Sequence, residues 1–154
     1  AIHVFKYRPL HALGQHLAAW MADSISLRPS IDTVMPVPLH VTRVHERGFN
    51  QSLLLAQGIS RKFRVPLRYD VLIRNRPTRP QVELPGSERS RNVRDAFSVV
   101  LPDAIKGRHI LLIDDVLTTG ATLNECARTL KSAGAGSVVA LTLARADGDP
   151  ASHG

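Results

Sequence analysis

The sequence predicts an α/β fold, namely a doubly wound, mostly parallel β-sheet with a flexible hood loop. Short apolar runs alternate with segments of helical periodicity, and the runs leave no polar face, which is typical of parallel strands covered on both sides. Residues 74–88 are rich in Pro and Arg without an apolar period, and they account for the hood loop. We expect a single domain over residues 1–145 and a frayed tail over residues 146–154.

The first half of the chain predicts a helix, a strand, a basic loop and a second helix. Residues 10–25 place apolar side chains at helical spacing. Residues 33–37 predict a short buried strand, and residues 38–48 form a loop with several basic side chains. Asn50 is a suitable N-cap for the second helix, and Pro66 ends it.

The second half supplies the remaining strands and two more helices. Strands are expected at residues 67–73, 96–100, 110–113 and 137–143, and the one at residues 110–113 is central. A short helix is expected from Ser87 to Val93, and a longer one follows the central strand and is capped near Gly134. Parallel α/β sheets bind ligands at the carboxyl ends of their strands, so the loops after residues 33–37 and 110–113 should share one cleft.

The composition of the chain is typical of a globular protein that binds an anionic partner. The chain has 154 residues, of which 44% are hydrophobic and 21% charged, as expected for a globular protein. No apolar run reaches the roughly 18 residues of a membrane span, and no secretory signal is visible, so a cytoplasmic location is expected. The single cysteine, Cys126, is expected to be a core residue. The net charge of +7 favours an anionic partner, either a small polyanion or a nucleic acid.

Residues 109–122 are the most informative segment. An apolar strand runs into Asp114 and Asp115, and a turn of small residues around Gly120 then leads into a helix. Backbone N–H groups of such a turn favour an anion, and ionised carboxylates accept hydrogen bonds from sugar hydroxyls. Hydroxyl donors for phosphate oxygens come from Thr118, Thr119 and Thr122. The order of these groups predicts a pocket for a sugar phosphate.

Other interpretations of this segment fit less well. A buried strand with an acidic helix cap explains neither both carboxylates nor three threonines around one glycine. A nucleotide-triphosphate loop requires Gly-Lys-Ser/Thr, and no lysine lies between Lys106 and Lys131. A dinucleotide fingerprint requires three spaced glycines, whereas Gly120 stands alone.

The segment resembles the phosphoribosyl-pyrophosphate (PRPP) signature of type I phosphoribosyltransferases. The resemblance implies that Asp114 and Asp115 bind the ribose 2- and 3-hydroxyls. It further implies a 5-phosphate site formed by Thr118, Thr119, Gly120, Ala121 and Thr122. PRPP also carries a pyrophosphate, so a second anion site is expected.

Two arginine-bearing loops are candidates for that second site. The backbone near Leu39 and His40, with Arg43 and Arg47, is expected to bind pyrophosphate; a solvated basic loop is the alternative. The hood loop is expected to close over the reacting diphosphate with Arg74, Arg79, Gln81 and Arg89. Its alternative is a solvated loop without chemistry.

Further motifs are similar to the ComF/GntX-like branch of that family, which is linked to bacterial DNA uptake (competence). They are Pro36-Val-Pro38-Leu39, Arg47-Gly-Phe-Asn-Gln51, Thr78-x-x-Gln81, and Arg89-x-x-Asn92-Val93 with Phe97. The resemblance covers nearly the whole chain. Members of that branch usually carry an N-terminal zinc module with four cysteines, which this sequence with its one cysteine does not contain. Either the module lies upstream of Ala1 or this member lacks it, and no zinc site is predicted within the sequence.

The resemblance implies a pentosyltransferase of the phosphoribosyltransferase type that binds PRPP with Mg²⁺. It would transfer the phosphoribosyl group to an unidentified acceptor, such as a nitrogenous base, and release pyrophosphate. The expected catalytic residues are Asp114, Asp115 and Arg47, and the two aspartates would hold Mg²⁺ through water. The alternative is a non-catalytic or weakly catalytic competence protein that binds PRPP and contacts single-stranded DNA or other competence proteins. A homodimer is also expected.

Overall fold

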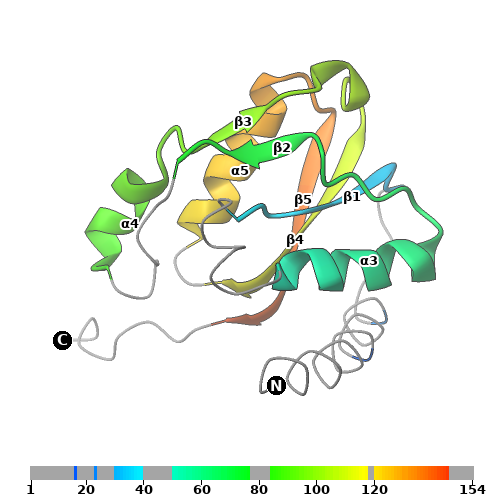
Figure 1. Cartoon of the computed structure of the whole chain (residues 1–154), viewed down its shortest axis with the longest axis horizontal. Coiled ribbons are helices and arrows are strands. Elements are labelled where there is room, and N and C mark those ends of the chain that lie inside the picture. The colour runs from blue at the N-terminus through cyan, green and yellow to red at the C-terminus, as the bar shows by residue number, and fades with distance from the viewer. Residues whose placement is uncertain are drawn as a thin grey trace, which may run out of the picture.

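The structure, a computed structural model, describes residues 16, 23, 30–39, 50–76, 84–117 and 120–145. The elements within these ranges alternate between strands and helices, as the sequence predicts (Figure 1). In chain order they are β1 (Thr33–Pro36), α3 (Gln51–Phe63), β2 (Leu72–Arg74), α4 (Gly86–Val93), β3 (Phe97–Val99), the 3-10 turn η2 (Pro102–Ala104), β4 (His109–Leu117), α5 (Ala121–Ser132) and β5 (Ser137–Arg145).

The main sheet is parallel and has the strand order β1-β4-β5. Val34 of β1 lies opposite Leu111 of β4, which in turn lies opposite Val139 of β5. On the outer side of β1, Leu67 forms a parallel bridge with Val34. β2 and β3 form a separate antiparallel pair. The predicted α/β fold with a mostly parallel sheet is confirmed.

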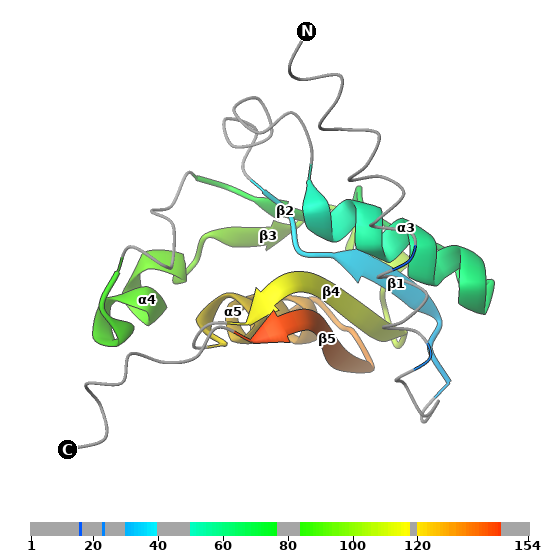
Figure 2. The same ribbon diagram turned by 90° about the horizontal axis from the view of Figure 1, so that it is seen from below.

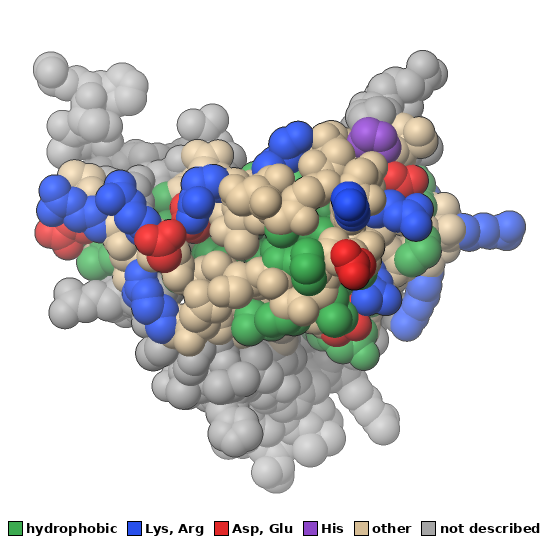
Figure 3. Space-filling view, turned by 90° about the horizontal axis from the view of Figure 1, so that it is seen from above, with side chains coloured by type: hydrophobic (Ala, Val, Ile, Leu, Met, Phe, Trp, Pro, Cys, Tyr) green, Lys and Arg blue, Asp and Glu red, His purple; other side chains and the backbone are tan. Residues whose placement is uncertain are grey.

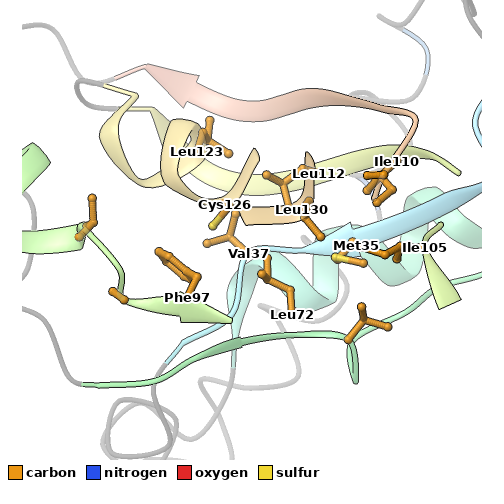
Figure 4. Packing of buried hydrophobic residues seen from close by; sticks show 14 of the residues in the cluster. Met35, Val37, Leu72, Phe97, Ile105, Ile110, Leu112, Leu123, Cys126 and Leu130 are labelled. Atoms are coloured by element: carbon orange, nitrogen blue, oxygen red, sulfur yellow. The ribbon is translucent and has the colours of Figure 1, made fainter. Parts of the chain in front are cut away.

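Two apolar layers cover the two faces of the sheet, because successive residues of β4 point to opposite sides. Leu111 and Ile113 pack with α3 through Leu55 and Ile59. On the other face, residues of α5, β2 and β3 pack on β4 (Figure 4). Labelled members of this cluster include Leu72, Phe97, Ile110, Leu112, Cys126 and Leu130. Cys126 is fully buried, as expected for a core residue.

The boundaries of the helices follow from local residues. Asn50 accepts hydrogen bonds from the backbone N–H groups of Ser52 and Leu53, so the predicted N-cap of α3 is confirmed. α3 ends at Phe63, before Pro66, because Arg64 adopts a left-handed conformation with φ 54°. α5 begins after Gly120, whose φ of 82° suits glycine better than any residue with a Cβ.

Three predictions of strand structure need correction. The expected strand 67–73 is divided, because Leu67 stays beside β1 while β2 begins at Leu72 and pairs with β3. β4 does not end at residue 113 but continues through both aspartates to Leu117, paired with β5. β5 is less covered than expected for a strand buried on both faces, since Val139 is 42% exposed.

Other predictions fall on parts of the chain outside the described residues. These are most of the helix expected at residues 10–25, the loop from residue 40 to residue 49, the hood at residues 77–83 and the tail from residue 146. Within the described ranges, every helix is too short or too polar to cross a membrane.

Candidate functional site

The carboxyl ends of β1 and β4 lie next to each other, because the two strands are parallel neighbours. The helices α3 and α5 begin after these strand ends, so their N-termini are directed to the same edge of the sheet. In Figure 2 the arrowheads of β4 and β5 point the same way, toward the side where α4 lies. This edge is where parallel α/β sheets bind ligands, as expected. Asp114 and Asp115 are located on it.

Asp114 is held by two hydrogen bonds to one of its oxygens. The hydroxyl of Ser52, in the first turn of α3, donates to Asp114 Oδ1 over 2.9 Å. The backbone N–H of Asp115 donates to the same oxygen, also over 2.9 Å. Burial, more than the neighbouring Asp115 carboxylate, raises the pKa of the Asp114 carboxyl to about 7, while the Ser52 donor opposes the rise. Asp114 is therefore a fixed and partly desolvated carboxyl group.

The turn into α5 has the properties of an anion site. Gly120 adopts the left-handed conformation, and its carbonyl accepts from the N–H of Asn124 over 2.8 Å, closing the first turn of the helix. Because the N-cap residue is a glycine, it makes no side-chain capping bond of its own. Ala121 and Thr122 follow in the first turn, where the positive end of the helix dipole favours an anion. The structure thus brings three of the five predicted 5-phosphate residues to the edge that holds Asp114.

Asn50 joins this edge to the end of β1. Its side-chain amide donates to the carbonyl of Val37 over 3.3 Å, while its Oδ1 accepts from the first turn of α3. The same side chain therefore fixes both ends of the segment that contains the predicted pyrophosphate residues. Leu39, the one of these residues that the structure describes, lies half-buried just after β1. The role of Ser52 was absent from the sequence prediction, since its partner Asp114 is 62 residues away.

Several predicted site residues lie outside the described residues: His40, Arg43, Arg47, Arg79, Gln81, Thr118 and Thr119. The placement of Arg74 in the hood loop is corrected. It is the last residue of β2, and its guanidinium lies 4.8 Å from the centre of the Phe97 ring. Arg89 lies in α4, as the helix predicted from Ser87 to Val93 implies.

The segment after α4 is attached to α5 through polar groups. Arg76 donates to the carbonyls of Asn92 and Arg94 over 2.9 and 2.8 Å, at the carboxyl end of α4. The N–H of Asp95 donates to Glu125 over 3.0 Å, and Arg128 bonds the Asp95 carboxylate over 3.1 Å. Asp95 has a φ of 54°, which costs energy for a residue other than glycine, so these contacts also hold a strained turn. α4 and α5 are thereby linked.

Solved structures with the same fold point to one class of protein. The fold is similar to that of a structure described as the allosteric regulatory enzyme of purine biosynthesis, with a TM-score of 0.61 and 23% identity over 86% of this chain and 26% of that one. A second similar structure is the glutamine PRPP amidotransferase from B. subtilis, with a TM-score of 0.58 and 21% identity over 84% of this chain and 26% of that one. The fold is therefore that of the type I phosphoribosyltransferases.

The sequence gives the family directly. The chain belongs to the phosphoribosyl transferase domain family, whose model matches residues 49–152. It is 40% identical over 114 residues to the DNA utilization protein YhgH of Escherichia coli (strain K12), covering 74% of this chain and 49% of that protein. It is 37% identical over 116 residues to competence protein F of Haemophilus influenzae, covering 75% and 51%.

A third relative is competence protein ComFC of Bacillus subtilis, which is 35% identical over 113 residues, covering 73% of this chain and 44% of that protein. These relatives confirm the predicted similarity to the ComF branch. The chain spans about half the length of the curated relatives it matches.

Proposed function

We propose that this protein binds PRPP with Mg²⁺ at the carboxyl edge of the sheet and transfers its phosphoribosyl group to an acceptor. One observation carries the proposal: β4 carries Asp114 and Asp115, and the chain leads from them within a few residues to the left-handed Gly120 and the N-terminus of α5. Carboxylates for ribose hydroxyls and a helix N-terminus for the 5-phosphate thus follow each other closely along the chain.

The donor set at this edge suits Mg²⁺. In the described residues, no group of three or more His, Cys, Asp or Glu side chains converges, so a dedicated protein cage for a metal is absent there. Mg²⁺ usually binds one or two carboxylates and takes its remaining ligands from water and substrate phosphates. Asp114 and Asp115 provide such a pair, and bound Mg²⁺ would supply positive charge toward the pyrophosphate.

Other residues of the site would bind the 5-phosphate and the pyrophosphate of PRPP. Gly120, Ala121 and Thr122, with Thr118 and Thr119, would bind the 5-phosphate. The backbone of Leu39 and His40 and the guanidinium groups of Arg43 and Arg47 would bind the pyrophosphate. In the reaction, the bond from ribose C1 to the pyrophosphate oxygen breaks and the acceptor bonds to C1 from the opposite face. Arg79, Gln81 and Arg89 would approach the leaving pyrophosphate from the hood side and exclude water.

A thermal shift titration tests the binding. With Mg²⁺ and PRPP at about 100 times the Kd, we expect the parent protein to gain about 2.7 kcal/mol, and hence roughly 5–10 °C in Tm. The double variant Asp114→Asn, Asp115→Asn should show no gain, because its neutral amides replace both carboxylates. A parent protein whose Tm does not respond to PRPP with Mg²⁺ would contradict the proposal. Release of pyrophosphate, measured with a panel of bases, separates catalysis from binding.

The second candidate function is a PRPP-binding competence protein that contacts single-stranded DNA with its basic side chains. The relatives named for competence and DNA utilization and the net charge of +7 favour it. Figure 3 shows Lys and Arg over much of one face, at both ends and nearer the middle, with some Asp and Glu beside them and neutral and hydrophobic groups between. Aromatic residues form only 5% of the chain, which disfavours binding through stacked bases. If the arginines contact DNA phosphates, affinity for a single strand should fall steeply as salt rises.

Two further predictions have their own tests. A homodimer would be detected by analytical ultracentrifugation, and a cytoplasmic location by fractionation of the source cells.

A further inference from the structure

Ser52 contacts the candidate site from an element other than β4. Its hydroxyl donates to Asp114 Oδ1 over 2.9 Å, and the residue is 5% exposed. A buried hydroxyl that donates to a carboxylate forms a charge-assisted hydrogen bond whenever the acid is ionised. Ser52 therefore touches a group that the proposed function assigns to ribose, although Ser52 itself belongs to a different element.

Two hydrogen bonds to one oxygen fix the orientation of the Asp114 carboxylate. Oδ1 accepts from both Ser52 Oγ and the N–H of Asp115, each over 2.9 Å. A carboxylate oxygen offers about two lone pairs, so these two donors fill Oδ1. Oδ2 takes neither of these two bonds, and the carboxylate, which also interacts with the Asp115 side chain, cannot rotate about its last torsion without breaking both of them.

Ser52 is itself held in place by the cap of α3. Its backbone N–H donates to Asn50 Oδ1 over 3.0 Å, and Asn50 donates to the carbonyl of Val37 at the end of β1 over 3.3 Å. The hydroxyl is thus placed by contacts to the neighbouring strand rather than by its own rotamer alone. Groups held by such supporting hydrogen bonds keep a productive geometry before a ligand arrives.

We infer that Ser52 is a positioning residue for PRPP, which orients the Asp114 carboxylate so that Oδ2 faces the ribose hydroxyls. The inference rests on the proposed function. Ser52 would not contact the reacting atoms, and its effect would pass through Asp114. The competing explanation is a structural role, in which Ser52 only secures the first turn of α3.

The same helix contains a matched control. Ser60 donates its hydroxyl to the carbonyl of Val65 over 2.5 Å, at the end of α3 remote from the site. Ser60→Ala and Ser52→Ala each remove one hydroxyl donor from α3, but only Ser52 contacts Asp114. Ser52→Thr keeps the hydroxyl, and Ser52→Cys keeps the shape with a much weaker donor, which serves if the alanine variant fails to fold.

The test is isothermal titration of each variant and the parent with PRPP in the presence of Mg²⁺, after thermal unfolding has shown which variants fold. We expect Ser52→Ala or Ser52→Cys to bind about tenfold more weakly than the parent, as is typical when a supporting hydrogen bond to a ligand-binding group is lost. Ser52→Thr should bind close to the parent, and so should Ser60→Ala.

Each other outcome counts against a particular statement. If the parent binds PRPP and Ser52→Ala binds equally well, the positioning role is wrong and the proposed function stands. Equal weakening by Ser60→Ala, or no recovery in Ser52→Thr, would assign the effect to helix stability and also overturn the positioning role. A parent protein that does not bind PRPP overturns both.

Discussion

Two polar connections join helices of this protein to neighbouring segments, and they differ in how far their side chains are exposed to solvent. The first joins α3 to β4 through Ser52 and Asp114, where Ser52 is buried and Asp114 is half-buried. The second joins α5 to the turn after α4 through Arg128 and Asp95, whose side chains are 55% and 78% exposed. Water screens the second pair strongly and the first only weakly.

The difference separates two kinds of structural role. A buried hydrogen bond to a carboxylate changes both the position and the proton affinity of that group, so it acts directly on the chemistry of a site. An exposed ion pair selects one geometry for a turn but adds little free energy of folding. We therefore expect changes around Asp114 to alter binding and pH response, and changes around Arg128 to alter mainly local order.

Ile113→Ala should cause the largest loss in the free energy of unfolding. It removes apolar packing between β4 and α3, next to the hydrogen bond from Ser52 to Asp114. Ile113 is fully buried, packs in the α3 cluster and immediately precedes Asp114. Such a truncation leaves a cavity and costs about 2–5 kcal/mol in the free energy of unfolding. Urea denaturation measures the loss, and a loss below about 1 kcal/mol would show that the β4–α3 layer is poorly packed.

Asp114→Asn should change the free energy of unfolding by less than Ile113→Ala does, and it should stabilise the fold instead of destabilising it. The pKa of Asp114 rises from 3.8 to about 7 on folding, so the folded state binds more protons between these values. The stability contribution of Asp114 is therefore present at low pH and is lost as pH rises toward about 7. An amide stays neutral, so at pH 8 we expect the ligand-free variant to be more stable than the parent by roughly 1–3 kcal/mol.

Urea denaturation of Asp114→Asn and the parent at pH 4 and pH 8 provides the measurement. The difference between the two proteins should be small at pH 4 and should grow with pH. A difference independent of pH would mean that Asp114 does not titrate in this range. A gain in stability together with loss of PRPP binding would show that this carboxylate is kept for function at the expense of the fold.

Arg128→Ala should cause the smallest change in the free energy of unfolding, because it removes only the exposed ion pair with Asp95. An exposed ion pair contributes about 0–1 kcal/mol, so the Tm should change by at most a few degrees. Faster hydrogen exchange at the N–H of Asp95 would report looser attachment of the turn, since that group bonds Glu125. A loss of several kcal/mol in the free energy of unfolding would contradict the expectation that this exposed ion pair contributes little.

The elements that the sequence predicted well are those specified by neighbouring residues. The run of apolar residues before Asp114, the glycine at position 120 and the capping residue Asn50 each act within one or two turns, so local pattern was sufficient. These features also predicted the family and the edge of the sheet that holds the two aspartates.

The features that could not be predicted from the sequence depend on contacts between residues far apart in the chain. The bond from Ser52 to Asp114 needs the packing of α3 on β4, and no local pattern marks that serine. The position of Arg74 on Phe97 depends on the antiparallel pairing of β2 with β3, which redirects a segment expected to be one strand followed by a loop. Val139 is 42% exposed because β5 is an outer strand of the described sheet.

The hydrogen bond from Asn50 to Val37 has a consequence for how this family can change. It joins the two ends of the segment from residue 38 to residue 49 at the sheet, so the strand and helix on either side are fixed independently of what lies between. Each doubling of the length of such a closed segment costs only about 0.6 kcal/mol. Lengthening this segment should therefore cost little free energy of folding, as long as Asn50 and Val37 keep their bond.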